Sequence, residues 1–332
     1  MVNIFLNAGI SALFAGLTAI GVAALIEKFG GLIGGVLGST PTTIIPAMVG
    51  IYIEYEANQE KYTNSAFSVP IGTFTNSLFL FTWGFLPKYL PIKNTNKKLI
   101  LMLFISLSVW FAVAVSVMAL RQFVTEKYDF DHRYFGTIFL CLHFVFAMAT
   151  TFFQKTIKPK GKNKTSWYMI LIRGIGAGAI IFLSIVLSKY AGPSVAGVSS
   201  IFPVVFLTTI MTVWISQGES VALGAVGPLM LGMVSVPTYS IVSSFLVFII
   251  GIAWGSLATY VICISYSTLA VLFLRIRQKS IDRQYTILIN QPSLSGSELL
   301  GNKELDNKEP IEEMESIQYL DGNRLLSEHS TK

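Results

Sequence analysis

Residues 30–46 read GGLIGGVLGSTPTTIIP, and this stretch decides how the rest of the chain is interpreted. It is apolar enough to lie in a membrane, but its glycines and prolines argue against one regular helix through it. An interrupted apolar segment is a candidate binding element in a membrane protein, above all when the chain contains a second copy.

The composition predicts an integral membrane protein. Of the 332 residues, 53% are hydrophobic and 13% are charged, and the mean hydropathy is +0.63. These values lie outside the range of ordinary soluble domains. The formal charge of +6 falls beside long apolar runs, which indicates contact with membrane lipid and not a nucleic-acid surface.

About nine apolar runs are long enough to span a bilayer, because a helix needs about 20 residues to cross about 30 Å of hydrocarbon. The predicted fold is therefore an all-α polytopic membrane protein. The runs cover residues 3–26, 31–53, 66–86, 99–120, 134–153, 167–187, 192–215, 221–246 and 250–274. The weakest boundary separates the last two runs, where Pro228 and Pro237 interrupt one long apolar stretch, so about eight to ten spans fit the pattern.

The distribution of Lys and Arg predicts the orientation. Alternate loops, at residues 88–98, 155–164 and 275–283, are rich in Lys and Arg, whereas residues 54–61 and 121–133 carry acidic residues among their cations. By the positive-inside rule the first set of loops is cytosolic. The N-terminus is then lumenal or extracellular and the C-terminus cytosolic, which requires an odd number of spans.

A second copy of the opening stretch occupies residues 190–208, YAGPSVAGVSSIFPVVFLT. When Pro41 is placed on Pro203, a glycine earlier in each copy also coincides. Each copy then continues through a polar break into another apolar run with a proline, Pro70 in the first and Pro228 in the second. Duplication explains this shared order, and chance similarity of two Gly-rich membrane segments is the alternative.

Duplication divides the chain into a first membrane repeat, a linking helix with a basic loop, a second repeat and a tail. These parts cover residues 1–122, 123–166, 167–276 and 277–332. A unit of four spans ends on the side where it began, so one linking span makes the second unit start from the opposite face. The repeats are therefore predicted to be inverted, as in secondary transporters whose site lies near the midplane between the halves.

The second copy also carries a recognisable pattern, made of Ala196-Gly197-x-x-x-x-Phe202-Pro203, a polar break near Gly218, and Gly232-Met233-x-Ser235. This pattern resembles the GlpM-type small bacterial inner-membrane proteins, short chains that correspond to a single repeat. The resemblance covers residues 188–247 and, more weakly, residues 28–83, where Thr40 stands in place of the Phe. It implies a duplicated membrane unit and supplies no substrate.

Polar side chains at the interrupted segments are the candidate substrate-binding residues. Helix breaks free backbone carbonyls and amides, which together with hydroxyls can hold a monovalent ion or a small polar solute. The interrupted segments contain no Asp or Glu, which weighs against divalent cations. The candidates are Ser39, Thr40, Pro41, Thr42, Asn76, Ser199, Ser200 and Pro203. The alternative is that small residues let helices pack closely and hydroxyls satisfy the neighbouring backbone.

Two titratable residues complete the candidate site. Arg173 either faces the cavity as a counter-charge for an anionic solute or extends to the lipid headgroups. His143 lies at membrane depth, where it either carries protons or is a hydrogen-bonded structural residue. Glycines 174, 176 and 178, which follow Arg173, predict a close contact between helices.

No catalytic, metal or cofactor site is expected. The glycine-rich opening stretch lacks the Lys of a phosphate-binding P-loop. The 3 histidines of the chain show no metal-ligand spacing, and no nucleophile and base are paired in the sequence.

The tail turns polar and charged after residue 276, which predicts disorder on the cytosolic side. Tyr285 and Leu288 fit a tyrosine-based sorting signal, and Asp321, Leu325 and Leu326 fit an acidic dileucine signal. Both signals imply binding to clathrin adaptors and a lysosomal or endosomal membrane, with the plasma membrane as the alternative.

The sequence therefore predicts a secondary transporter of a small polar or ionic solute that works by alternating access between inverted repeats. The paired broken segments favour this function. A non-transporting membrane scaffold or accessory subunit is the alternative, in which the Gly-rich helices dock a partner.

Overall fold

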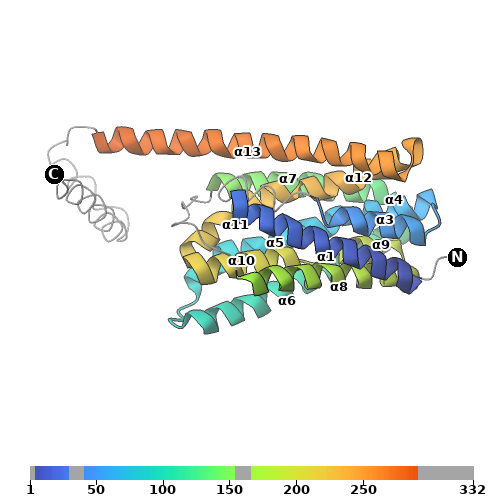
Figure 1. The fold of residues 1–332 in the computed structure, drawn as a ribbon, viewed down its shortest axis with the longest axis horizontal. Helices are drawn as coiled ribbons and strands as arrows, with labels where there is room; N and C mark the ends of the chain where they lie inside the picture. The colour runs from blue at the N-terminus through green and yellow to red at the C-terminus, as the bar shows by residue number, and fades with distance from the viewer. Residues whose placement is uncertain (1–3, 30–40, 154–165, 291–332) are drawn as a thin grey trace. The chain divides into compact units, whose positions relative to one another are not determined.

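The computed structural model describes residues 4–29, 41–153 and 166–290. These ranges fold into helices, and no strand occurs within them. Within them, 8 helical segments are long and apolar enough to cross a membrane. The prediction of an all-α polytopic membrane protein is therefore confirmed (Figure 1).

The candidate spans agree with the predicted runs except at the second one. They are Ile4–Val22, Gln59–Tyr89, Thr95–Tyr128, His132–Phe153, Trp167–Tyr190, Pro193–Ser216, Glu219–Ile250 and Ile252–Ser280. The described part of the expected span at residues 31–53 forms one shorter helix, α3 (Ile44–Glu54), and residues 30–40 lie outside the described residues. The long apolar stretch with Pro228 and Pro237 divides into two spans as predicted, with Gly251 between them at a φ of 82°.

The helices follow one another along the chain as labelled in Figure 1, and each broken span is built from two helices. Besides α3, the elements are α1 (Ile4–Phe29), α4 (Gln59–Ala66), α5 (Val69–Phe85), the 3-10 turn η1 (Leu86–Tyr89), α6 (Thr95–Tyr128), α7 (His132–Phe153), α8 (Trp167–Tyr190), α9 (Pro193–Ser199), α10 (Val204–Gln217), α11 (Glu219–Met233), α12 (Ser235–Ile250) and α13 (Ile252–Asn290).

The chain divides into two compact units, Met1–Gln278 and Lys279–Lys332. The described residues of the second unit are the end of α13, which continues to Asn290. Tyr285 and Leu288 therefore lie in helical backbone, so the prediction of disorder is wrong for residues 277–290; residues 291–332 lie outside the described residues. The dileucine signal at Asp321, Leu325 and Leu326 lies outside the described residues.

The second glycine- and proline-containing segment is interrupted, as predicted. α9 ends at Ser199 and α10 begins at Val204, with Pro203 directly before it. Proline has no backbone N–H, so it cannot continue the hydrogen bonding of α9. The break leaves backbone carbonyls near Ile201 free to accept hydrogen bonds from other helices.

Two further breaks divide the spans that follow the polar turns. α4 and α5 meet at Phe67 and Ser68, and α11 and α12 meet at Val234. Pro70 and Pro237 lie within the first turn after these breaks, which explains why the helices restart there. By contrast, Pro228 lies inside the continuous helix α11.

α1 and α8 pack closely through small residues. A Cβ added at Gly16 would lie 3.0 Å from the carbonyl oxygen of Gly174, and one at Gly178 would lie 2.8 Å from that of Ala12. These pairings run in opposite directions along the two helices, so α1 and α8 are antiparallel. The predicted close contact of the glycines is confirmed, with Gly176 against Val204 of α10. Inverted repeats require opposite directions for these two helices, although the repeat relationship itself stays a prediction.

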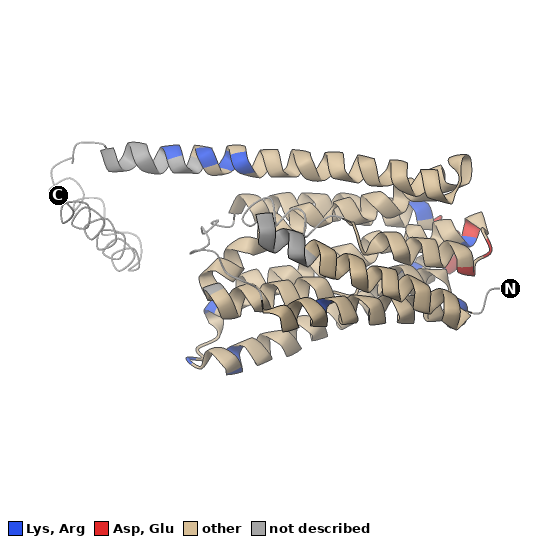
Figure 2. Ribbon diagram, in the orientation of Figure 1, with Lys and Arg blue, Asp and Glu red and all other residues tan. Residues whose placement is uncertain are grey.

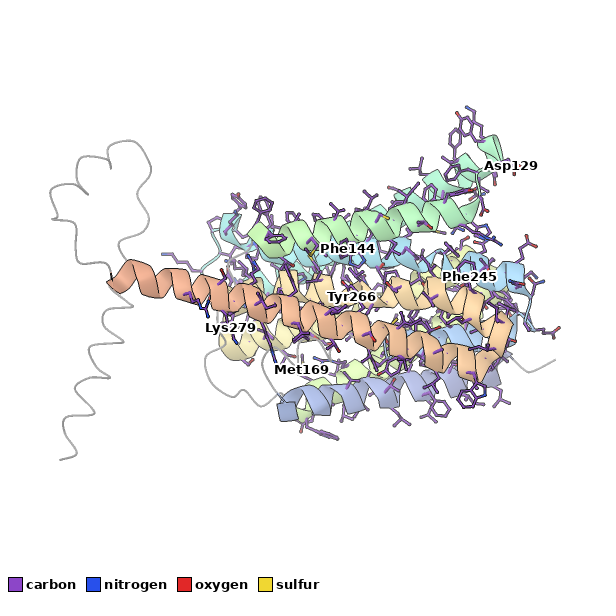
Figure 3. The ribbon with its side chains drawn as sticks, turned by 90° about the horizontal axis from the view of Figure 1, so that it is seen from above. Asp129, Phe144, Met169, Phe245, Tyr266 and Lys279 are labelled. Atoms are coloured by element: carbon purple, nitrogen blue, oxygen red, sulfur yellow. The ribbon has the colours of Figure 1, made fainter. Side chains whose placement is uncertain are left out.

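Aromatic side chains from both halves of the chain form much of the core within residues 1–278. Trp83 of α5 and Trp214 of α10 are buried, and their rings meet edge to face with centroids 5.6 Å apart. Figure 2 shows long uncharged stretches along the middle of the helices. At one end Asp129, at a φ of 51°, lets α6 turn directly into α7 (Figure 3).

Candidate functional site

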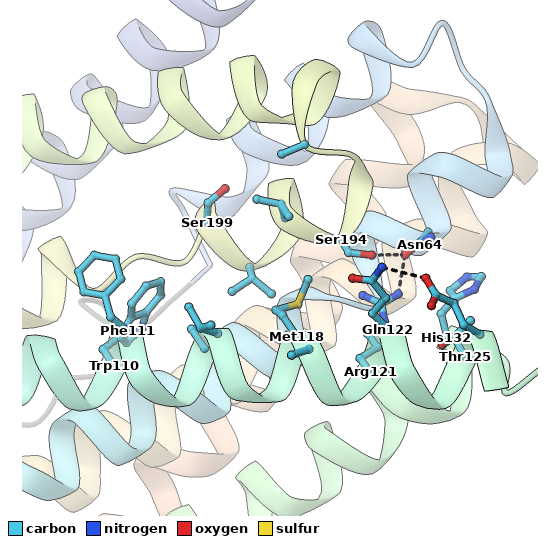
Figure 4. A pocket seen from close by; sticks show the side chains of 17 residues that line it. Asn64, Trp110, Phe111, Met118, Arg121, Gln122, Thr125, His132, Ser194 and Ser199 are labelled. Atoms are coloured by element: carbon cyan, nitrogen blue, oxygen red, sulfur yellow. Dashed lines mark hydrogen bonds between the residues drawn. The ribbon is translucent and has the colours of Figure 1, made fainter. Parts of the chain in front are cut away.

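A cavity of about 760 Å³ lies between α6 and α9. α6 forms one wall and α9 the opposite wall, as Figure 4 shows. Asn64 of α4 and His132 of α7 line one end, and Trp110 and Phe111 of α6 line the other. Its volume falls within the range of about 300–1,000 Å³ that is usual for small-molecule sites.

Arg121 of α6 is the buried charge in the cavity wall. Its exposed fraction is 4%, although it lines the cavity. Its Nη1 donates a hydrogen bond to the Ser68 hydroxyl, and its Nη2 donates to the side-chain oxygen of Asn64. The Ser194 hydroxyl, from α9, donates to the same Asn64 oxygen at 3.0 Å. The Arg121 guanidinium therefore joins α6 to α4 and to the α4–α5 break, and Asn64 extends the network to α9 (Figure 4).

The partners of Arg121 are neutral. Within the described ranges the ion pairs are Lys98 with Glu219 and His132 with Asp131, so no carboxylate pairs with Arg121. A buried charge is costly unless a counter-charge compensates it. The Arg121 guanidinium therefore carries a positive charge, and its hydrogen bonds to Asn64 and Ser68 do not neutralise it.

The sequence interpretation missed Arg121 because it ended the fourth span at residue 120. In the structure α6 continues to Tyr128, so residues 121–128 are helix and not loop. Gln122 donates a hydrogen bond to Glu126 at 2.8 Å, one turn further along, which supports this extension. Good helix formers after Leu120 were the available signal.

Asn76 of α5, a predicted binding residue, supports one end of the cavity and does not line it. Its fully buried side chain accepts a hydrogen bond from Trp110 Nε1 at 2.7 Å and donates to the carbonyl oxygen of Ile201 at 2.7 Å. Ile201 belongs to the break between α9 and α10. The amide therefore satisfies a carbonyl freed by the break and fixes the Trp110 ring.

The other predicted residues of the second copy gather at the same break. Ser199 lines the cavity. The Ser200 hydroxyl donates to the carbonyl oxygen of Gly197 at 2.7 Å, which is the backbone-satisfying alternative, and Pro203 precedes α10.

No described residue of the first copy, residues 41–46, lines this cavity. Thr42 lines a separate, apolar pocket of about 580 Å³ between α1 and α3, Pro41 precedes α3 in a bend, and Ser39 and Thr40 lie outside the described residues. Thr42 and Ser199 therefore line different pockets, and a site shared by the two interrupted segments stays a prediction.

Neither titratable candidate lines either of these two cavities. Arg173 of α8 is buried, and its Nε donates to the Thr208 hydroxyl of α10 at 3.3 Å, so it does not extend to the headgroups. His143 of α7 is fully buried, and its Nε2 lies 3.3 Å from the carbonyl oxygen of Met230 in α11. These contacts match the structural alternative for His143.

An ion pair links the opposite end of α6 to α11. Lys98 Nζ lies 2.7 and 2.8 Å from the two carboxylate oxygens of Glu219, the first residue of α11. Lys98 and Arg121 are about 35 Å apart along the helix, from a rise of about 1.5 Å per residue. The ion pair therefore lies near the first turn of α6, whereas Arg121 lies near its last turns.

Comparison with protein-family models gives no match to this chain, and comparisons with curated proteins and with solved structures give none either. The resemblance to the GlpM-type proteins therefore stays a prediction.

Proposed function

We propose that the protein is a secondary transporter of a small polar or ionic solute, and that the cavity between α6 and α9 is its binding site. The observation that carries the proposal is that this cavity borders two helix breaks. Ser199 and the α9–α10 break lie on one side, and Asn64, in the last turn of α4 before the α4–α5 break, lies on another. Broken helices around a cavity are typical of transporters that alternate between two openings.

The proposal includes the orientation expected from Lys and Arg. With the loop at residues 88–98 cytosolic, the Lys98–Glu219 pair closes the cytosolic side and the end of the cavity at His132 faces the lumen or the exterior. Solute release to the cytosol then requires this ion pair to separate. A lysosomal or endosomal membrane, with adaptors bound by the tail, is part of the same proposal.

Flux through the purified full-length protein in liposomes tests the proposal. A panel of radiolabelled glucose, glycine, choline, benzoate and inorganic phosphate covers neutral, cationic and anionic solutes. We expect at least one solute to enter faster than into protein-free liposomes. Absence of transport for the whole panel, with correctly folded protein, would overturn the assignment in favour of a scaffold.

A matched pair of α6 variants tests the place of the site. Ala119 lines the cavity and Ala112 does not, and both residues are exposed. Ala119→Trp places an indole in the cavity and is expected to reduce flux at least tenfold, whereas Ala112→Trp retains it. Equal flux in the two variants would remove the cavity from the transport path.

A further inference from the structure

We propose that the cavity takes an organic anion and that Arg121 binds its carboxylate or phosphate group. This inference names the substrate class and rests on the proposed function for its physiological meaning. Its starting point is the buried guanidinium with only neutral partners, at the wall of a cavity large enough for a small molecule.

The charges around the cavity leave Arg121 uncompensated. Glu126 also lines the cavity, but it is exposed, accepts from Gln122 of its own helix and is not within ion-pair distance of Arg121. His132, at the same end, lies 3.4 Å from Asp131. No described carboxylate pairs with Arg121, so a bound anion would supply its missing counter-charge.

The geometry of the guanidinium suits such a ligand. Arginine presents five N–H donors in a planar fork, and the structure uses donors on Nη1 and Nη2 for Ser68 and Asn64. Carboxylates and phosphates match this fork with two parallel hydrogen bonds. The other N–H donors of Arg121 are enough to bind one further acceptor group.

The rest of the lining indicates that the anion has an apolar part. Trp110, Phe111, Val115 and Met118, on α6 like Arg121, also line the cavity. Figure 4 shows Trp110 and Phe111 at the end of this wall away from Arg121. Apolar walls with a few placed polar groups are usual for sites that bind organic molecules. A small aromatic or aliphatic carboxylate or phosphate ester fits this combination better than a bare inorganic ion.

Isothermal titration of the purified full-length protein with benzoate, phenyl phosphate and neutral benzamide tests the inference. We expect saturable binding of at least one of the two anions and at least tenfold weaker binding of benzamide. A headgroup of an anionic lipid offers the same chemistry, so a third arm adds phosphatidic acid in micelles. Phosphatidic acid and phenyl phosphate are each tested as competitors of benzoate binding. If phosphatidic acid competes at the lower concentration, the natural ligand is a lipid; if phenyl phosphate does, it is a soluble solute.

Asn64→Asp provides the sharpest variant, because it is isosteric and places a carboxylate on the atom that accepts from Arg121 Nη2. Internal pairing should weaken anion binding at least tenfold while the protein unfolds at the same or a higher temperature. Asn58→Asp, at the N-cap of the same helix, is the matched control and should bind as the wild type does. Arg121→Gln removes the charge and should also abolish binding.

The two proposals fail separately. Failure of both anions to bind the folded wild type, or unchanged binding in Asn64→Asp, overturns the anion site even when another solute is transported. If the anions bind as expected but no solute is transported, the anion site stands and the proposal of a transporter is overturned.

Discussion

Asn76 holds the α9–α10 break in place, and its replacement by alanine tests this role. The substitution removes two hydrogen bonds at once, the one from Trp110 Nε1 and the one to the carbonyl oxygen of Ile201, each 2.7 Å long. Trp110 is 4% exposed and Ile201 is 8% exposed, so water does not readily replace the lost partner. Both groups are left unsatisfied inside the helix bundle.

The expected magnitude follows from two scales. An unsatisfied buried donor or acceptor costs about 1–3 kcal/mol. Interhelical hydrogen bonds inside membranes contribute less, about 0.6 kcal/mol on average and about 1.7 kcal/mol at most. For two such bonds to Asn76 we expect the free energy of unfolding to fall by about 2–3 kcal/mol.

Unfolding of the purified protein in mixed micelles of increasing denaturing detergent measures this loss. Ser77→Ala is the control, because Ser77 is equally buried but donates only to the carbonyl oxygen of Thr73 in its own helix. The control should cost under about 1 kcal/mol. Trp110→Phe combined with Asn76→Ala should cost less than the sum of the two single changes. Equal losses for Asn76→Ala and Ser77→Ala would refute the reasoning.

Two further predictions concern packing and charge. Gly178→Val should lower the free energy of unfolding by about 1–3 kcal/mol, because its Cβ would lie 2.8 Å from the carbonyl oxygen of Ala12. Gly9→Val should be nearly neutral, because a Cβ there has no neighbour within 4 Å. Thermal unfolding in detergent compares the two variants, and similar losses would contradict the close α1–α8 contact. Lys98→Glu should lower the free energy of unfolding by about 0.5–1 kcal/mol, and adding Glu219→Lys should restore most of this loss. Both effects should be smaller at high salt. If the double variant is no more stable than Lys98→Glu, the ion pair contributes nothing to stability.

Much of the fold follows from composition and from local sequence rules. The apolar runs predict the spans because the bilayer requires about 20 apolar residues per helix. The break before Val204 follows from Pro203, and the close helix contact follows from the small residues at 174 and 178. Each of these features is determined within one turn or one span of the chain.

The site depends on contacts that no local rule supplies. Asn76 meets Ile201 across a separation of 125 residues, and Arg121 meets Asn64 across 57. A window that searches for uncharged residues stops at Arg121, even though its side chain is buried and its helix continues. Thr42 and Ser199 belong to the two paired segments of the sequence, yet Thr42 lines a pocket between α1 and α3 and Ser199 lines the cavity between α6 and α9.

The most direct test of transport through this cavity is the side from which Ser199 can be reached. In a Cys141→Ser background, Ser199→Cys is exposed in liposomes to a membrane-impermeant thiol reagent added to either face. Alternating access predicts labelling from the cavity face at His132, and labelling also from the opposite face once Glu219→Gln removes the partner of Lys98. Labelling from the same single face in both variants would contradict the account.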